Sequence, residues 1–308
     1  MNILLTGAAG QLGRELLPLL ARQGNVVPLD RDAPPRPVTG WVSLDLMDGG
    51  ALETLLNRTR PDLIVNTAAY TAVDQAESDP ETACEINAAL PGRLARWAQR
   101  NCAGLVHYST DYIFNGEAVK PYIESDIPDP LSVYGDSKLA GERAIVAAGC
   151  RHVILRTSWV YSSHGKNFLL SMLNLARKGL SLKVVDDQRG CPTWARNLAL
   201  ATDAVVDKWL RTEQPGLDGT YHYRDSQALN WYEFARAIFS HALEAGLLPA
   251  LPDIKPVPSS DFQQPATRPR FSVLDAGKIN ETFGIAPADF QKSLSAVIGE
   301  VSNLETPG

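Results

Sequence analysis

The sequence predicts an α/β protein in which a doubly wound parallel sheet is joined to a second, smaller α/β lobe. Two observations predict the sheet: short apolar runs alternate with segments of helical apolar spacing, and the first run leads directly into a glycine-rich turn. Strands separated by helices pair in parallel through right-handed crossovers, which gives the Rossmann arrangement. The smaller lobe is predicted because the regular alternation stops near residue 160.

The first half of the chain supplies the expected sheet. Buried strands are expected at 2–6, 25–30, 62–66, 104–109 and 152–156, and helices at 11–23, 49–58, 81–99 and 132–148. In the third helix, apolar residues recur with helical spacing at Ile86, Leu90, Leu94, Trp97 and Ala98. A proline-rich turn is expected at 33–37, after the second strand.

The second half of the chain is less regular. Short strands are expected at 182–185 and 219–223 and helices at 167–178, 195–210 and 232–245, while proline becomes frequent between residues 249 and 269. We therefore assign residues 1–160, together with about 187–218, to the larger domain. The smaller lobe takes about 161–186 and 219–308, and we expect it to close over the carboxyl ends of the strands.

Composition excludes several classes of function. No run of 18 apolar residues occurs, and the first residues lack the basic segment of a signal peptide, so we expect no membrane association. The net charge of −6, without a basic run, argues against nucleic acid as a partner. Four scattered cysteines without a CxxC pair indicate a reducing cytoplasm and argue against a disulfide framework or a zinc site.

The glycine-rich turn has the form of a dinucleotide-binding motif. Gly7, Gly10 and Gly13 stand at three-residue intervals between the first strand and the first helix. Glycine lets the backbone turn tightly and lets a pyrophosphate reach the open N–H groups of the helix. Asp30 ends the next strand, where a carboxylate would bind the adenosine ribose and disfavour a 2′-phosphate, an effect that Arg31 would soften. The alternative is an ordinary strand–helix turn.

A tyrosine and a lysine suggest acid–base chemistry. Tyr134 and Lys138 are four residues apart in the expected helix 132–148, so they project from one face. A phenol needs a positive neighbour to exchange a proton near neutral pH. Ser109 or Thr110, at the end of the strand 104–109, could bind a substrate oxygen as charge develops on it. The alternative is a surface Tyr–Lys pair, which the glycine turn makes less credible.

Several longer blocks resemble one enzyme family. The chain resembles an extended short-chain dehydrogenase/reductase and, more specifically, the dTDP-4-dehydrorhamnose reductases. The blocks that carry the resemblance lie at 66–74 with Glu77, 107–114, 133–142, 156–161, 187–193 and 265–269. This resemblance implies that NADH or NADPH delivers hydride to C4 of dTDP-4-dehydro-β-L-rhamnose, giving dTDP-β-L-rhamnose. It assigns dinucleotide binding to the larger domain and the nucleotide sugar to the smaller lobe.

The resemblance also implies roles for individual residues. Tyr134 is the proton donor, Lys138 adjusts its pKa, and Thr110 binds the reacting oxygen. The implied cofactor contacts are Gly7, Gly10, Gln11, Leu12, Gly13, Asp30, Asp45, Leu46, Ala68, Ala69, Tyr70, Thr71, Asn87, Tyr134 and Lys138. The implied substrate contacts are Thr110, Asp111, Val73, Trp159, Asn167 and Arg268. Asn167 and Arg268 would bind the diphosphate; alternatively they are a helix cap and a surface charge.

One departure concerns magnesium. Some members of the family bridge a dimer through a magnesium ion held by glutamates on the first helix and on the helix after the Pro-Thr turn. Glu15 is present, but the second position is Arg196, which cannot ligate a metal, so we expect no metal site. Arg196 could instead pair with Glu15 of a partner chain, or the protein could be monomeric; monomer and homodimer both remain open.

Two other functions are compatible with the same motifs. A nucleotide-sugar epimerase or dehydratase has the same fold and retains its cofactor. A non-catalytic regulatory subunit, resembling that of methionine adenosyltransferase, keeps the fold without turnover; the presence of Thr110, Tyr134 and Lys138 argues against it. His107 and His152 are interpreted as packing in or beside core strands, and the other histidines lack metal-ligand spacing.

Overall fold

A seven-stranded parallel sheet organises the larger part of the molecule. The computed structural model describes residues 1–34, 37–211 and 216–305, so part of the expected proline-rich turn, residues 35 and 36, lies outside the described residues. The strand order is β11-β6-β5-β4-β1-β2-β3, and every pairing is parallel. The strands are β1 (Asn2–Thr6), β2 (Asn25–Asp30), β3 (Val42–Ser43), β4 (Leu63–Asn66), β5 (Gly104–Thr110), β6 (Arg151–Thr157) and β11 (Gly219–His222).

The order of the strands confirms the doubly wound fold. The chain runs outward from β1 to β3 on one side and from β4 to β11 on the other, so the direction of winding reverses between β1 and β4. In sheets of this kind, ligands bind at the carboxyl ends of the strands near the reversal. The Gly7 turn, Asn66 and Thr110 all follow or end strands at this edge.

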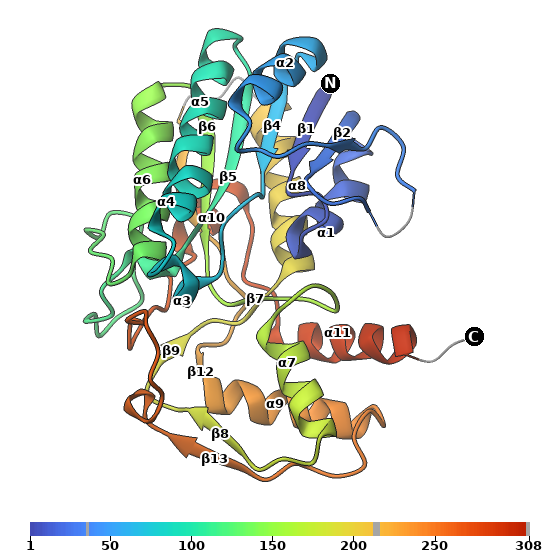
Figure 1. Ribbon diagram of the computed structural model, residues 1–308, viewed down its shortest axis with the longest axis vertical. Helices are drawn as coiled ribbons and strands as arrows, with labels where there is room; N and C mark the ends of the chain where they lie inside the picture. Colours follow the sequence, from blue (N-terminus) through green and yellow to red (C-terminus); the bar gives the residue numbers. More distant parts are fainter. Residues whose placement is uncertain (35–36, 212–215, 306–308) are drawn as a thin grey trace.

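Helices cover both faces of the sheet (Figure 1). Helices α1 (Gln11–Leu20), α8 (Ala195–Arg211) and α10 (Gly277–Phe283) bury Leu16, Leu20, Val205, Trp209 and Phe283 against one face. Helices α2 (Gly49–Thr59) and α5 (Leu90–Arg100), with α6 (Val133–Ala148), cover the other face with Leu52, Leu56, Leu94, Trp97 and Ile145. Burial on both faces explains why the strands are continuous apolar runs.

The predicted helix 81–99 is divided. It consists of α4 (Pro80–Cys84), a π-helical turn η1 (Glu85–Ala89) and α5, and the short α3 (Val73–Ala76) precedes it. The π turn inserts one residue and places Asn87 in the interior. Pro91, near the start of α5, lacks the N–H that a regular helix would use at this point.

The smaller lobe is built from short strands and three helices, which Figure 1 shows below the large sheet. Its strands are β7 (Val160–Tyr161), β8 (Leu182–Val185), β9 (Arg189–Gly190), β10 (Thr193–Trp194), β12 (Leu229–Asn230) and β13 (Ile254–Val257), paired as β10-β7, β12-β9 and β13-β8. Its helices are α7 (Phe168–Arg177), α9 (Trp231–Glu244) and α11 (Phe290–Glu305). Two short 3-10 turns, η2 (Asp111–Ile113) and η3 (Ser259–Asp261), complete the described elements.

One expected strand lies elsewhere than we assigned it. We placed 219–223 with the smaller lobe, whereas β11 pairs with β6 at the edge of the large sheet, and α10 packs beside it. The boundary expected at residue 219 is therefore too early for this strand, because a strand of four residues, Gly-Thr-Tyr-His, carries no pattern that reveals which sheet it joins. The rest of the division into two domains stays a prediction. Within the described ranges, no helix is long and apolar enough to cross a bilayer.

Candidate functional site

The glycine turn lies where β1, β4 and α1 meet. Gly7 has φ +69°, and a Cβ there would lie 2.6 Å from the Thr67 hydroxyl oxygen. A Cβ on Gly13 would lie 2.2 Å from the carbonyl oxygen of Gly7. Gly10 caps α1 without a side-chain hydrogen bond, so no side chain covers the first N–H groups of this helix. The turn is thus a backbone cradle beside an open helix start, which suits an anionic group.

A cavity of about 270 Å³ opens beside this turn. Its lining includes Gly7, Gly10, Asp30, Arg31, Asp45, Leu46, Ala68 and Ala69. The Asp30 carboxylate accepts hydrogen bonds from the backbone N–H groups of Ala9 (2.9 Å) and Arg31 (2.8 Å). Asp30 therefore fixes the turn and also lines the cavity. The Arg31 guanidinium is exposed and pairs with Asp32 at 3.7 Å.

Asn87 ties the cofactor side of the site to helix α6. Its side chain accepts from the N–H of Tyr70 (2.9 Å) and donates to the carbonyl of Tyr70 (3.0 Å) and the hydroxyl of Ser137 (3.0 Å). Gly141 permits the close approach, since a Cβ there would lie 2.1 Å from the Asn87 carbonyl oxygen. The π turn therefore places Asn87 where its side chain can hydrogen-bond both the loop 68–71 and α6.

Helix α6 places Lys138 in the interior and Tyr134 half-buried on the same face. Ser132 caps the helix by accepting from the N–H of Gly135 at 3.2 Å. Lys138 is 2% exposed, and its ammonium group donates to the carbonyl of Tyr108 at 2.6 Å. Burial lowers the pKa of Lys138 to about 8, with Glu142 opposing the shift. Burial raises the pKa of Tyr134 to about 12, and a hydrogen bond with Thr110 opposes this shift.

Thr110 and Asp111 complete the corner at the end of β5. The Thr110 hydroxyl accepts from the N–H of Tyr112 (3.2 Å) and donates to Asp111 (3.1 Å). Asp111 is 2% exposed and also accepts from Ser158 (2.9 Å) and Ser272. Burial raises the pKa of Asp111 to about 6, although these hydroxyl donors lower it. Of the two hydroxyls considered from the sequence, Thr110 and not Ser109 is the one bonded to Tyr134.

An aromatic pair connects this region to the smaller lobe: Trp159 follows Ser158, which donates to Asp111, and Trp231 begins α9. Trp159 has φ +47° and stacks on Trp231 with ring centroids 3.5 Å apart and planes 7° apart. A Cβ on Gly190 would lie 2.5 Å from the Trp159 ring, so glycine makes room for this indole. A cavity of about 360 Å³ lies beside the pair, lined by Phe168, Met172, Leu175, Lys183, Val184, Val185, Gln188, Trp231, Phe262, Gln264 and Arg268. Sequence reasoning missed Trp231; its only signal is its place after the helix cap Asn230.

The two residues expected to bind the diphosphate differ in their availability. Asn167 caps α7 by accepting from Leu170 N–H, and its amide donates toward Gln11 (2.9 Å) and two backbone carbonyls. This geometry favours the capping role. Arg268 forms a two-pronged pair with Asp74 (2.9 and 2.7 Å) next to Val73, and it also lines the 360 Å³ cavity. Arg268 is therefore held at the cavity and is not a free surface charge.

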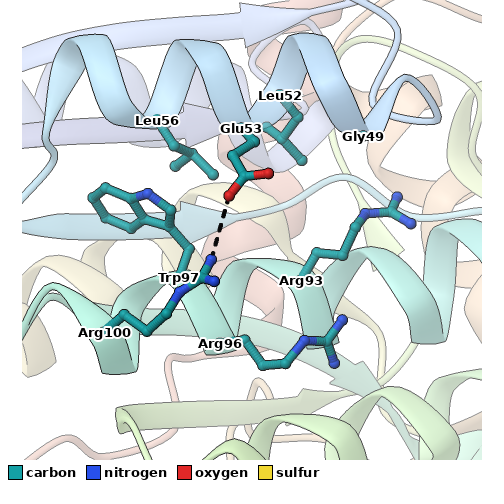
Figure 2. Close-up of a pocket in the computed structure, with 8 residues that line it drawn as sticks. All are labelled: Gly49, Leu52, Glu53, Leu56, Arg93, Arg96, Trp97 and Arg100. Atoms are coloured by element: carbon teal, nitrogen blue, oxygen red, sulfur yellow. Dashed lines mark ion pairs between the residues drawn. The ribbon is translucent and has the colours of Figure 1, made fainter.

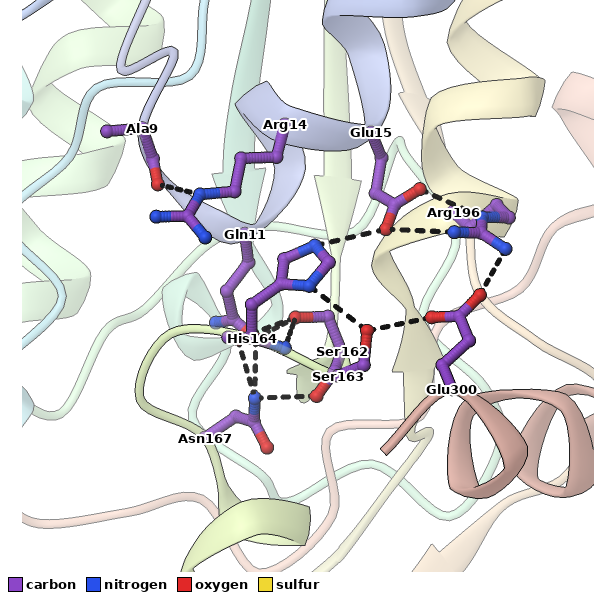
Figure 3. A network of polar contacts seen from close by, with 10 residues as sticks. All are labelled: Ala9, Gln11, Arg14, Glu15, Ser162, Ser163, His164, Asn167, Arg196 and Glu300. Atoms are coloured by element: carbon purple, nitrogen blue, oxygen red, sulfur yellow. Dashed lines mark hydrogen bonds and ion pairs between the residues drawn. The ribbon is translucent and has the colours of Figure 1, made fainter. Parts of the chain in front are cut away.

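Arg196 lies in a network that joins the two lobes (Figure 3). Its guanidinium donates to Glu15 of α1 at 2.8 Å and to Glu300 of α11. His164 lies 3.2 Å from Glu15, and Ser163 donates to Glu300 at 2.7 Å. The sequence left open whether Arg196 pairs with Glu15 of a partner chain or the protein is monomeric. In this structure the pair forms within one chain, because α1 and α8 pack side by side. Among the described residues, no group of three or more His, Cys, Asp or Glu is placed to hold a metal ion.

A cluster of arginines on α5 lies away from the corner. Arg93, Arg96 and Arg100 of α5 surround a cavity of about 200 Å³ against α2 (Figure 2). Arg93 is paired with Glu85 and donates to the Leu46 carbonyl at 3.2 Å, and Arg100 pairs with Glu53 at 3.5 Å. These contacts hold α2, α5 and the 44–47 segment together, so we interpret this cavity as structural.

Comparison with known proteins places the whole chain in one context. Residues 1–303 match the family described as RmlD substrate binding domain. The chain is 40% identical over 301 residues to dTDP-4-dehydrorhamnose reductase of Escherichia coli K12, covering 98% of each protein. It is 37% identical over 311 residues to a probable dTDP-4,6-dihydroxy-2-methyloxan-3-one 4-ketoreductase of Streptomyces antibioticus, covering 100% of this chain and 98% of the relative.

Solved structures agree with these sequence relatives. A dTDP-4-dehydrorhamnose reductase from Clostridium acetobutylicum superimposes with a TM-score of 0.86 at 35% identity, covering 98% of this chain and 99% of that one. A dTDP-4-dehydrorhamnose reductase from Bacillus anthracis, in complex with NADP, has a TM-score of 0.84 at 32% identity, with 97% and 99% covered.

Proposed function

This chain belongs to the dTDP-4-dehydrorhamnose reductase family, and on that premise we propose how its own residues carry out the reaction. It is an NAD(P)H-dependent oxidoreductase of dTDP-rhamnose biosynthesis that reduces the C4 ketone of dTDP-4-dehydro-β-L-rhamnose to dTDP-β-L-rhamnose. The observation that carries the residue roles is the gathering of Thr110, Tyr134 and Lys138 at the end of β5, on the same edge of the sheet as the glycine turn.

The residues at the turn fit a dinucleotide. The cradle at Gly7 and Gly13, which a Cβ would fill, and the open start of α1 suit a pyrophosphate. Asp30 and the 270 Å³ cavity suit the adenosine, with Asp45, Leu46, Ala68 and Ala69 on its walls. The remaining proposed contacts are Gly10, Gln11, Leu12, Tyr70, Thr71, Asn87, Tyr134 and Lys138. When bound, the reduced nicotinamide supplies the hydride.

The proton comes from Tyr134 in this proposal. On substrate binding the Thr110 hydroxyl turns its one hydrogen from Asp111 to the C4 oxygen and orients that oxygen toward the Tyr134 phenol. The oxygen gains negative charge as hydride arrives, so the phenolic proton moves onto it and the product alcohol forms. The phenolate that is left is stabilised by the Lys138 ammonium. Because Lys138 must be charged for this, activity falls as pH rises through the Lys138 pKa, which burial lowers to about 8.

The nucleotide sugar lies between this corner and the smaller lobe in our proposal. Asp111 accepts from sugar hydroxyls, and Trp159 offers an apolar face to the C–H side of the deoxyhexose. The nucleotide occupies the 360 Å³ cavity, where Arg268 supplies positive charge for the diphosphate. Val73 and Asn167 remain proposed contacts at the margin. A cytoplasmic location, supported by four unpaired cysteines, and a monomer or homodimer complete the proposal.

Two assays test the proposal against its rivals. The purified protein should oxidise NADH or NADPH only when the dTDP-4-keto sugar is added, with one dTDP-rhamnose formed per cofactor consumed. An epimerase or dehydratase would instead convert substrate catalytically on a retained NAD. A regulatory subunit would bind nucleotide without turnover. A second assay offers dTDP-4,6-dihydroxy-2-methyloxan-3-one, the ketone in the name of the Streptomyces relative. The ratio of kcat/KM for the two ketones shows whether the protein discriminates between these dTDP-sugars.

A further inference from the structure

A buried histidine beside Lys138 forms part of a polar chain through the sheet. His107 of β5 is 1% exposed, and its Nε2 lies 3.4 Å from Nζ of Lys138. Its Nδ1 lies 3.0 Å from the Asn66 side-chain nitrogen, and the Asn66 side-chain oxygen accepts from the Thr6 hydroxyl at 2.6 Å. These contacts connect β1, β4, β5 and α6. We call the four residues that make them the His107 chain: Thr6, Asn66, His107 and Lys138. The sequence suggested only packing for His107.

Hydrogen-bonding capacity explains what the imidazole can do in this position. An ammonium group only donates, so a charged Lys138 requires Nε2 of His107 as the acceptor. Burial, with Lys138 nearby, holds the pKa of His107 well below its usual range, so the ring is neutral. Asn66 can donate and accept, so with its amide turned over its oxygen accepts from Nδ1–H of His107 and its nitrogen donates to the Thr6 hydroxyl.

The same contacts fix the direction of the lysine. The carbonyl of Tyr108, at 2.6 Å, and Nε2 of His107 take up two ammonium hydrogens. One ammonium hydrogen is left for another acceptor, and Tyr134 lies one helical turn away on the same face of α6. A four-carbon side chain held by two acceptors at its tip has little rotational freedom left to lose on binding.

We propose that His107 is a positioning residue for Lys138: its neutral imidazole, fixed by Asn66, orients the ammonium group and stabilises its charged form. The inference rests on the proposed roles of Lys138 and Tyr134. His107 touches neither substrate nor cofactor in this arrangement and acts only through the lysine.

Other groups around Lys138 do not replace the histidine. Glu142, one turn further along α6, favours the charged lysine, but its carboxylate is already paired with Arg156 of β6 at 2.7 Å. Tyr134 is the only other titratable group that shares this face of the described helix α6. Charged groups on neighbouring elements are engaged elsewhere: Asp74 with Arg268, Glu85 with Arg93, and Asp111 with Ser158 and Ser272.

The test compares three substitutions by the pH dependence of kcat. His107→Phe keeps an aromatic ring and removes the acceptor, so the charged lysine loses a hydrogen bond and the basic limb should move down by about one pH unit. His107→Asn keeps a partner for Asn66 but does not reach Lys138, and should behave in the same way. His107→Gln keeps an acceptor for Lys138 and should return the limb close to its original position.

A control separates positioning from loss of stability. Thr202→Val removes a buried 2.8 Å hydrogen bond to the Tyr108 phenol on the other face of β5. It should lower the melting temperature without moving the limb. If His107→Phe and His107→Asn lower only the melting temperature, or if His107→Gln fails to restore the limb, His107 is a packing residue and the proposal is overturned.

A measurement without substrate keeps the two proposals distinguishable. Nuclear magnetic resonance of isotope-labelled lysine, with the signal assigned by its loss in Lys138→Met, gives the Lys138 titration in the ligand-free protein. That titration should shift down in His107→Phe. An unchanged titration overturns the role of His107 and leaves the reaction proposal intact. Full activity of Lys138→Met would instead overturn the proposed role of the lysine itself.

Discussion

The corner at the end of β5 and the cavity of the smaller lobe hold their side chains in opposite ways. In the corner, Thr110, Asp111 and Lys138 are buried and each is fixed by short hydrogen bonds to neighbours. In the cavity, Trp231 and Phe168 make aromatic contacts, with ring centroids 4.6 Å apart. A hydrogen bond fixes the direction of a side chain, whereas an aromatic contact allows one ring to shift relative to the other. The contrast suggests that the chemistry is pre-organised and that recognition is adaptable.

The largest effect should come from removing the proton donor in the corner. Tyr134→Phe should lower kcat by at least ~10²-fold, the scale of lost general acid catalysis. The KM for the nucleotide sugar should change little, because the phenol contributes to the transition state and not to the cavity. Steady-state kinetics checks this. Near-normal turnover would mean that the corner is not where the proton is transferred.

A substitution in the cavity should have a different signature. Trp231→Leu removes the ring stacked on Trp159, so we expect the KM for the nucleotide sugar to rise about tenfold while kcat stays within about twofold. Phe239→Leu, a buried aromatic on the same helix away from the cavity, is the matched control for stability. A kcat loss as large as that of Tyr134→Phe would remove the contrast between the two regions.

A substitution at Asp30 tests the proposed cofactor site at the glycine turn. We expect NADH to be used at least as well as NADPH, since the carboxylate disfavours a 2′-phosphate and exposed Arg31 softens the effect. Asp30→Ala should shift the ratio of kcat/KM values toward NADPH by about fivefold. Glu53→Ala, which removes an exposed carboxylate on α2 outside the lining of the 270 Å³ cavity, should leave the ratio unchanged. A strong NADPH preference in the unaltered protein would show that Arg31 dominates this site.

The smallest effect is expected at the Glu15–Arg196–Glu300 network, which joins the two lobes. EDTA should not change the molecular mass measured by light scattering, because Arg196 is already the cation between Glu15 and Glu300. Arg196→Glu brings carboxylates together, so its melting temperature should become dependent on divalent cations. A dimer of the unaltered protein that dissociates with EDTA and re-forms with magnesium would contradict this prediction.

Local patterns made much of the sheet predictable. The run into Gly7, the acidic end of β2 and the spacing of Tyr134 and Lys138 are all visible within a few residues, because each reflects one strand, one turn or one helix. The expected strands at 2–6 and 25–30 have the bounds found in the structure. The π turn at Asn87 could not be predicted in this way. It depends on the contacts of Asn87 with Ser137 and Gly141 of α6, and the apolar spacing of the segment does not reveal them.

Features that depend on distant partners could not be predicted. The Arg268–Asp74 pair joins residues 194 positions apart, and β11 finds its place only by pairing with β6. Trp231 looks like the first turn of an ordinary amphipathic helix until its ring is seen against Trp159. His107 looks like a core residue of a strand until Lys138 is placed beside it by a different element.

The Glu15–Arg196–Glu300 network also has a consequence for folding. Arg196 is 181 residues from Glu15 and 104 residues from Glu300, so the ion pairs that fix the first long helix form only between remote parts of the chain. Contacts of such high sequence separation are costly in loop entropy and slow folding. During synthesis, the interface between α1 and the smaller lobe is therefore complete only after α11 has been made.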